Sequence, residues 1–209
     1  MTGNKGVLVV ISGFSGAGKG TVMKRLLEKY NNYALSISAT TRNMRPGEEE
    51  GISYFFKTKD EFEDMIKEDR LIEYAKYVDN YYGTPKDYVV SKLNEGKDVI
   101  LEIEIQGAMQ VKEKNPDAIL VFITPPSAEE LKNRLIGRNT EDINTVNKRL
   151  SRAFEESKSM KEYDYILVND TVEECVDDLN RIISAEHFKS ARNSSLIDNI
   201  RDEVKIFSI

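Results

Sequence analysis

Residues 7–21 read VLVVISGFSGAGKGT, and their composition changes abruptly from apolar to glycine-rich. The first five are apolar and mostly β-branched, which is typical of a strand buried on both faces of a parallel sheet. After Gly20 the apolar residues recur at helical spacing, and Val22, Leu26 and Tyr30 share one side. The stretch therefore predicts a strand, a glycine-rich turn and a helix in direct succession.

The turn itself, residues 13–19, fits the pattern GxxxxGK of a phosphate-binding loop. In such a loop, backbone NH groups and a helix N-terminus surround phosphate oxygens, and the lysine reaches the β and γ phosphates. Gly20 stands where a serine or threonine usually binds Mg²⁺, although Thr21 follows it. The predicted nucleotide-phosphate segment comprises Gly13, Phe14, Ser15, Gly16, Ala17, Gly18, Lys19, Gly20 and Thr21.

Composition narrows the chemistry that the chain can carry out. Its 209 residues include 30 basic and 36 acidic side chains, a net charge of −6, which argues against a broad nucleic-acid surface. The single cysteine and single histidine exclude an intramolecular disulfide and paired-histidine metal sites, so any metal must be held by oxygen. We expect Cys175 to be a packed core residue and His187 to be a helix cap or surface residue.

The same sequence favours a cytoplasmic protein without a membrane partner. No stretch approaches the roughly 18 apolar residues of a membrane span. The first residues contain only five consecutive apolar side chains, too few for the apolar core of a signal peptide.

Later segments repeat the strand and helix patterns in alternation. Apolar strand patterns occur at residues 98–103, 118–124 and 163–168. Three helix starts carry capping-box spacing, in which a hydroxyl and a carboxylate each bond a backbone NH group. They pair Thr58 with Glu61, Ser127 with Glu130, and Thr171 with Glu174. The alternation predicts an α/β fold with a parallel sheet flanked by helices.

Two segments depart from this alternation. Residues 36–95 combine tyrosines, short alternating strands and a Pro-Gly turn, which predicts an inserted subdomain. Residues 127–161 are strongly charged and helical, with arginines at 134, 138, 149 and 152, which predicts an exposed and mobile lid. We assign the core to residues 1–35, 96–126 and 162–190, and a tail to residues 191–209.

Loops reading GKGT occur in nucleoside monophosphate kinases, and further motifs narrow the resemblance. In chain order they are SATTRNMRPGE (38–48), GISYFF (51–56), IEYA (72–75), NYYGT (80–84), LEIEIQG (101–107), PPS (125–127), RLIGR (134–138), KRL (148–150) and VND (168–170). Together they resemble the guanylate kinase family over roughly residues 5 to 187. The resemblance implies a P-loop NTPase-type core, a GMP-binding subdomain and a lid. It also implies transfer of the γ-phosphoryl group of MgATP to GMP, giving ADP and GDP.

The resemblance implies that Glu73 binds guanine, with Ser38 and Thr84 on the base edge. A carboxylate suits guanine because it accepts the neighbouring N1-H and amino hydrogens at once, whereas adenine would oppose a bare ring nitrogen to it. Taken alone, Glu73 is equally compatible with an outward-facing charge on an amphipathic strand.

For the GMP phosphate, Arg42 and Arg45 match the family's pair of arginines, and Tyr54 and Tyr82 match its phenol donors. Forked guanidinium groups suit a phosphate dianion because each can donate two parallel hydrogen bonds. Half-buried strand positions are the alternative for the tyrosines.

Glu102 and Glu104 lie two residues apart near the end of a buried strand, on one face at the sheet edge where ligands bind. We assign them to the acceptor side of the site, where they could orient hydrated Mg²⁺ or the donor arginines; a structural ion pair is the alternative. Many family members carry Asp in place of Glu104. No firm protein ligand to Mg²⁺ is expected, because ATP phosphates and water would hold the ion.

On the donor side, Arg134, Arg138 and Arg149 match the lid arginines that close over the triphosphate, and with Lys19 they form the predicted catalytic set. Asn139 replaces a glycine of the family's lid, while Asn169 matches its adenine-side position.

Two alternatives remain at this point. One is a non-catalytic guanylate-kinase-like module that binds phosphorylated partners through Arg42, Arg45 and Tyr54; the phosphate loop and lid arginines argue against it. The other is a kinase for a different monophosphate. Glu73 and Ser38 argue against that, but only weakly against IMP, which keeps the N1-H. The predicted partners are the small molecules ATP and GMP, and the oligomeric state is left open.

Overall fold

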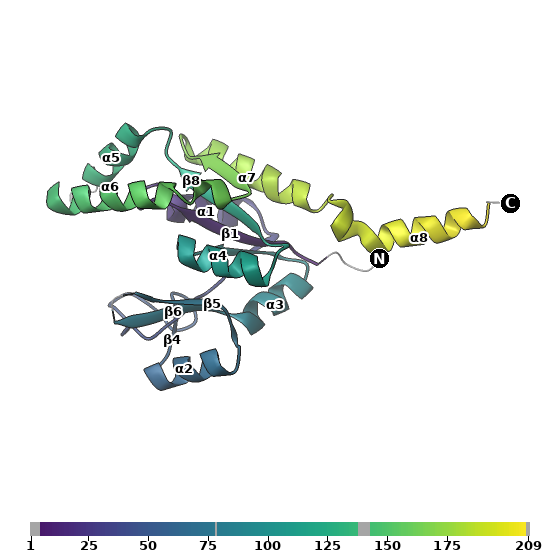
Figure 1. Ribbon diagram of the computed structural model, residues 1–209, viewed down its shortest axis with the longest axis horizontal. Coiled ribbons are helices and arrows are strands. Elements are labelled where there is room, and N and C mark those ends of the chain that lie inside the picture. The colour runs from purple at the N-terminus through teal and green to yellow at the C-terminus, as the bar shows by residue number, and fades with distance from the viewer. Residues whose placement is uncertain (1–4, 78, 138–142, 208–209) are drawn as a thin grey trace.

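A five-stranded parallel sheet forms the centre of the molecule (Figure 1). The computed structural model describes residues 5–77, 79–137 and 143–207. The strands lie in the order β2 (Tyr33–Leu35), β7 (Asp98–Glu102), β1 (Leu8–Gly13), β8 (Ile119–Thr124) and β9 (Tyr165–Val168). The predicted α/β fold is confirmed. Since β1 is the middle strand, its carboxyl end delivers Gly13 to the centre of the sheet edge, where ligands of such folds bind.

Helices cover this sheet, and one of them also touches a second sheet. They are α1 (Lys19–Lys29), α3 (Lys86–Asn94), α4 (Ile105–Lys114) and α7 (Val172–Glu186). Helices α1 and α7 pack against each other, whereas α4 contacts β1 and β8 and also β5 (Leu71–Tyr77) of the second sheet. Helix α4 therefore lies between the two sheets (Figure 1).

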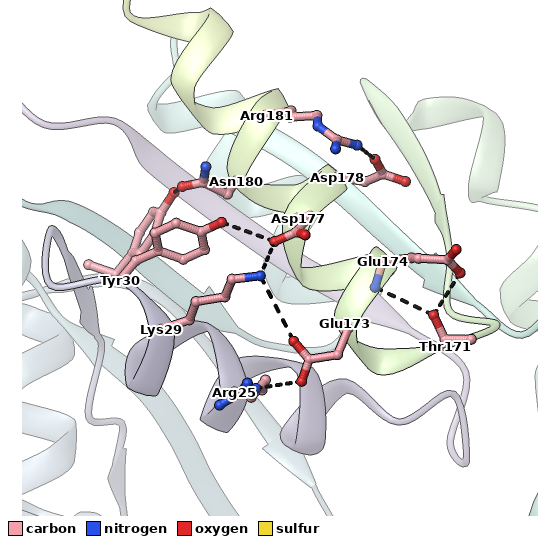
Figure 2. A network of polar contacts seen from close by, with 11 residues as sticks. Arg25, Lys29, Tyr30, Thr171, Glu173, Glu174, Asp177, Asp178, Asn180 and Arg181 are labelled. Carbon is pink, nitrogen blue, oxygen red and sulfur yellow. Dashed lines mark hydrogen bonds and ion pairs between the residues drawn. The ribbon is translucent and has the colours of Figure 1, made fainter.

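Polar contacts tie α1 to α7, as Figure 2 shows. Arg25 Nε lies 2.6 Å from Glu173 Oε1, and the Tyr30 hydroxyl donates to Asp177 at 3.0 Å. Lys29 lies between both carboxylates. Exposed pairs of this kind contribute little to stability, so their main effect is to fix the direction of the helix that follows the glycine-rich loop.

The second sheet has its own small apolar cluster. Its strands lie in the order β4 (Phe55–Phe56), β3 (Ala39–Thr40), β6 (Asn80–Pro85) and β5, with antiparallel pairing of β6 to both neighbours. Phe62 and Met65 of α2 (Lys59–Lys67) pack there against Ala39 and Leu71. The predicted capping box at the start of α2 is confirmed, since Thr58 and Glu61 each accept from the other's backbone NH.

The charged segment predicted as a lid forms α5 (Ala128–Ile136) and α6 (Ile143–Ser157), followed by the short helix η1 (Met160–Glu162). Ser127 caps α5 as predicted, and Thr171 caps α7. Leu131 and Leu135 of α5 are buried. Arg138 and Asn139 lie outside the described residues.

The tail forms η2 (Ser190–Asn193) and α8 (Ser194–Lys205), and α8 extends away from the body (Figure 1). None of the residues of α8 is buried. Within the parts of the chain that the structure describes, no helix combines the length and apolar character needed to cross a membrane.

Two expectations for single residues are confirmed. Cys175 is buried in the core on α7. His187 is the C-cap of α7, and its Nε2 lies 2.9 Å from Oδ1 of the buried Asp98, so it joins the end of α7 to the first residue of β7.

Strand β8, next to the middle strand β1, provides a test of the core. Phe122 is fully buried, and its ring centroid lies 4.9 Å from that of Phe14 and 5.2 Å from that of Tyr163. We expect Phe122→Ala to lower the free energy of unfolding by about 3–5 kcal/mol, because deletion of the ring leaves a cavity. Equilibrium urea denaturation measures this. The exposed Ile52 is the control, and Ile52→Ala should change it by less than about 0.5 kcal/mol; similar losses in both variants would contradict this account of the core.

Candidate active site

The glycine-rich loop connects β1 to α1 and is held in place from the other end of the chain. Gly18, the N-cap of α1, has φ 87°, a left-handed conformation that favours glycine. A Cβ atom there would lie 2.5 Å from Asn169 Nδ2, which itself donates to the Ala17 carbonyl oxygen at 2.8 Å. Lys19 Nζ donates to the Gly13 and Phe14 carbonyl oxygens at 2.7 and 3.2 Å. The loop is therefore already curled, with its lysine folded over it.

One cavity of about 540 Å³ runs from this loop to the second sheet. Its walls come from four segments: the loop, the second sheet, the connection from β7 to α4, and α6. The sequence-predicted residues that line it are Gly13, Ser15, Lys19, Ser38, Tyr54, Glu73, Tyr82, Glu102, Glu104 and Arg149. The structure thus brings both predicted halves of the site to one continuous space.

The wall formed by the second sheet contains a buried acid. Glu73 on β5 is 5% exposed, and Thr84 on β6, fully buried, donates its hydroxyl to Glu73 Oε1 at 2.7 Å. Burial raises the pKa of the Glu73 carboxyl, and the Thr84 hydrogen bond opposes that rise. Glu73 is therefore not the outward-facing charge that its strand position alone would allow.

The predicted phosphate-binding arginines do not line the cavity themselves. Arg42 donates from both terminal nitrogens to Glu48, at 3.0 and 2.8 Å, and this hydrogen bonding raises the pKa of Arg42. Its guanidinium lies 5.3 Å from the ring centroid of Tyr54, which does face the cavity. Arg45 is exposed, and its backbone NH donates to the same Glu48 carboxylate at 2.8 Å. Sequence reasoning missed Glu48 as the partner of Arg42.

On the opposite wall, Arg149 of α6 reaches the loop, where its Nη1 donates to Ser15 Oγ at 3.1 Å. Glu102 faces the cavity from the end of β7. Although Glu102 reaches solvent there, the surrounding protein buries its carboxyl enough to raise its pKa, and the charge of Lys19 opposes that rise. The loop end of the cavity is therefore the cationic end, with one carboxylate beside the lysine.

The spacing of Glu102 and Glu104 predicted that both lie on one face of a strand, and this is wrong. Strand β7 ends at Glu102, and Glu104 is the N-cap of α4. Both still line the cavity. Glu104 Oε1 accepts from Arg152 Nη2 at 2.8 Å, and Arg152 Nε donates to Glu156 at 2.8 Å. Arg152 and Glu156 also line the cavity, and sequence reasoning missed both as site residues. Helical spacing was the available signal, since Arg152 lies one turn after Arg149.

Three other predicted residues do not line the cavity. Arg134 pairs with Glu130 one turn earlier in α5, at 2.7 Å. Asn169 is buried against the loop, and Thr84 acts on the cavity through Glu73. Among the described residues, no group of three histidine, cysteine or acidic side chains could hold a metal ion.

A phosphate loop at the centre of a parallel sheet, facing a buried carboxylate across one cavity, defines a P-loop nucleotide-binding protein with a second, polar binding compartment. A family model described as guanylate kinase matches residues 5–186. A guanylate kinase of Lactococcus lactis is 52% identical over 97% of this chain and 98% of its own length. One of Caldanaerobacter subterraneus is 51% identical over 95% and 97%. The crystal structure of guanylate kinase from Anaplasma phagocytophilum is 34% identical, with a TM-score of 0.72 over 92% of each chain. The chain belongs to the guanylate kinase family.

The burial of Glu73 has a measurable effect on stability. Its carboxyl pKa is raised in the folded state, so the ionised form costs stability above that pKa, and the cost disappears as the pH falls through it. We expect Glu73→Gln to raise the melting temperature at pH 7, because the amide removes the buried charge and can still accept from Thr84. The advantage over the wild type should shrink by pH 5. Thermal unfolding of both proteins across this range measures it, and an advantage that is constant with pH would contradict the assignment.

Proposed function

We propose that the protein transfers the γ-phosphoryl group of ATP to GMP, with ATP at the glycine-rich loop and GMP in the compartment beside Glu73. One arrangement carries this proposal: Lys19 and the buried Glu73 line a single cavity, so two ligands bound at its ends would meet within it. Transfer between two nucleotides requires this kind of alignment more than it requires a covalent intermediate.

Guanine is the base whose hydrogen-bonding edge fits the Glu73 compartment. Thr84 occupies one oxygen of Glu73 and leaves acceptor capacity on the carboxylate for the N1-H and the amino group of guanine. The Ser38 side chain lines the same compartment and would contact the base edge. Adenine would leave the buried carboxylate opposed to a ring acceptor, which is costly in a site shielded from water.

The GMP phosphate is proposed to lie near Tyr54, Tyr82 and the guanidinium group of Arg42. Because both terminal nitrogens of Arg42 already donate to Glu48, binding of the phosphate there exchanges one anion for another. Glu48 thereby holds the guanidinium in place before the substrate arrives. Arg45, which does not line the cavity, is assigned to the same phosphate on the family resemblance alone.

The donor triphosphate is proposed to lie over the loop, with Lys19 and Arg149 close to its oxygens. Arg134 and Arg138 are assigned to the same role by their match to the family motif, and Asn169 to the adenine side. As negative charge shifts during transfer, fixed cations at this end stabilise it, and closure over the site excludes water as a competing acceptor. No side chain is assigned as a nucleophile.

Mg²⁺ is proposed to enter with ATP and to stay bound mainly to phosphate oxygens and water. Oxygen ligands suit this ion, and the Glu102 carboxylate beside Lys19 can hold its hydration shell. When bound, the ion neutralises phosphate charge. Gly20 has no hydroxyl to coordinate Mg²⁺, which agrees with an ion that has few direct protein ligands.

The non-catalytic binding module receives no support. A peptide-binding module has no need of Lys19 on a curled phosphate loop, nor of Arg149 reaching Ser15 from the facing helix. A cytoplasmic location and the division into core, GMP-binding subdomain, lid and tail stay predictions.

Replacement of the loop lysine tests the donor side. We expect Lys19→Ala to lower kcat by at least about 10²-fold, because a cation at the transferred phosphoryl group is lost. GMP binding, measured by calorimetry without ATP, should persist because the acceptor compartment is intact. Unchanged turnover would refute the assigned role of Lys19.

Base selectivity tests the acceptor side. A coupled assay that detects ADP, run with ATP, Mg²⁺ and GMP, IMP or AMP in turn, should show strong preference for GMP. In Glu73→Gln the preference for GMP over AMP in kcat/KM should fall by about ten- to a hundredfold, because the amide donates where guanine also donates. If the ratio stays as in the wild type, Glu73 does not read the base.

A further inference from the structure

We propose that helix α4 sets the affinity for the guanine nucleotide by positioning Glu73, through Gly107 and Gln110. Both are positioning residues: they act on GMP through the carboxylate. The inference rests on the proposed role of Glu73 in binding guanine. Its basis is a pair of close approaches between α4, which packs on the central sheet, and β5, which carries Glu73.

The first approach leaves no room for a side chain at position 107. Gly107 is buried in the first turn of α4, and a Cβ atom built there would lie 2.7 Å from Glu73 Oε2 and 3.3 Å from its carboxyl carbon. Real Cβ atoms essentially never approach another heavy atom below 3.0 Å. The Glu73 carboxylate therefore occupies space that every other residue type at position 107 would fill.

The second approach fixes the strand that carries Glu73. Tyr74 NH donates to Gln110 Oε1 at 3.3 Å, and Gln110 Nε2 donates to the Tyr74 carbonyl oxygen at 3.1 Å. A side-chain amide thus pairs with β5 as a neighbouring strand would, at the residue next to Glu73. Gln110 lies one turn after Gly107 on the same helix, so the two contacts act on adjacent residues of β5.

The contact at Gly107 can be separated from fold stability. A new Cβ would meet the carboxyl group of Glu73 and, at 3.3 Å, Ile103 Cδ1. Both contacts are with the ends of side chains, so Glu73 can swing away without movement of the backbone. Alanine also has a higher helix propensity than glycine in a helix interior. A methyl group at position 107 should therefore displace the carboxylate while leaving the fold at least as stable.

The first experiment measures steady-state kinetics and GMP affinity of Gly107→Ala. We expect KM and Kd for GMP to rise about tenfold, the loss of a positioned bidentate contact. At saturating GMP, kcat should change less than about twofold, because the lost contact binds GMP equally in the ground state and the transition state. KM for ATP should also change less than about twofold. The melting temperature should not fall. Gln106→Ala, an exposed neighbour on α4, is the control and should leave all of these values unchanged.

A shortened acid tests whether the effect passes through Glu73. Glu73→Asp withdraws the carboxylate from position 107 and weakens GMP binding by itself. Adding Gly107→Ala to Glu73→Asp should then change KM for GMP less than about twofold, against tenfold in the wild-type background. A tenfold change in both backgrounds would mean that the methyl meets the nucleotide directly, and would overturn the inference.

Gln110→Met keeps the side-chain length and removes both hydrogen bonds to Tyr74. We expect it to raise KM for GMP about threefold, with kcat retained, as the loss of partly exposed hydrogen bonds predicts. No rise in KM for GMP would remove Gln110 from the proposal.

Glu73→Gln, measured in parallel, separates two failures. If it leaves the GMP preference unchanged, the proposed role of Glu73 fails and this inference fails with it. If Glu73→Gln alters the preference while Gly107→Ala leaves GMP affinity unchanged, only the positioning by α4 is overturned.

Discussion

A carboxylate held away from water is the constraint on which the acceptor half of this molecule depends. The Glu73 carboxylate accepts a hydrogen bond from the Thr84 hydroxyl, while burial works against its ionised form. Such a group is costly in a fold that only has to be stable. Under the proposed function this cost has a use, because guanine would supply two further hydrogen-bond donors to the carboxylate. Helix α4 lets the strand and its acid approach closely, because Gly107 places no side chain between them.

The charges around the cavity follow a related logic. Arg42 is paired with Glu48, Arg152 with Glu104 and Glu156, and Lys19 with the carbonyl oxygens of its own loop. Cations gathered to bind a triphosphate and a monophosphate would repel one another without these partners. Each partner is an anion or dipole that a phosphate can replace, so the side chains are held near their working positions before either nucleotide binds. A net acidic chain can in this way maintain a locally basic cavity end.

Local patterns were sufficient to predict the strand, loop and helix of residues 7–21, the three hydroxyl caps of α2, α5 and α7, and the parallel sheet, although only α2 has the complete capping box. Each depends on neighbours within a few residues or on a run of apolar side chains. Strands as short as β3 and β4 leave little pattern to detect, and β2 was missed. Glu48, Arg152, Gly107 and Gln110 were missed as parts of the site for another reason. Each acts through a partner brought close only by tertiary packing, and Gly107 acts by having no side chain.

Asn169 closes the glycine-rich loop from a position 152 residues further along the chain. During synthesis on the ribosome, residues 13–19 emerge early, but the amide that supports Ala17 is made only when most of the polypeptide is complete. The strand β9 that precedes Asn169 must also join β8 from far along the sequence, a pairing that slows folding. A nascent chain therefore lacks a finished nucleotide-binding loop until nearly the whole protein has been translated.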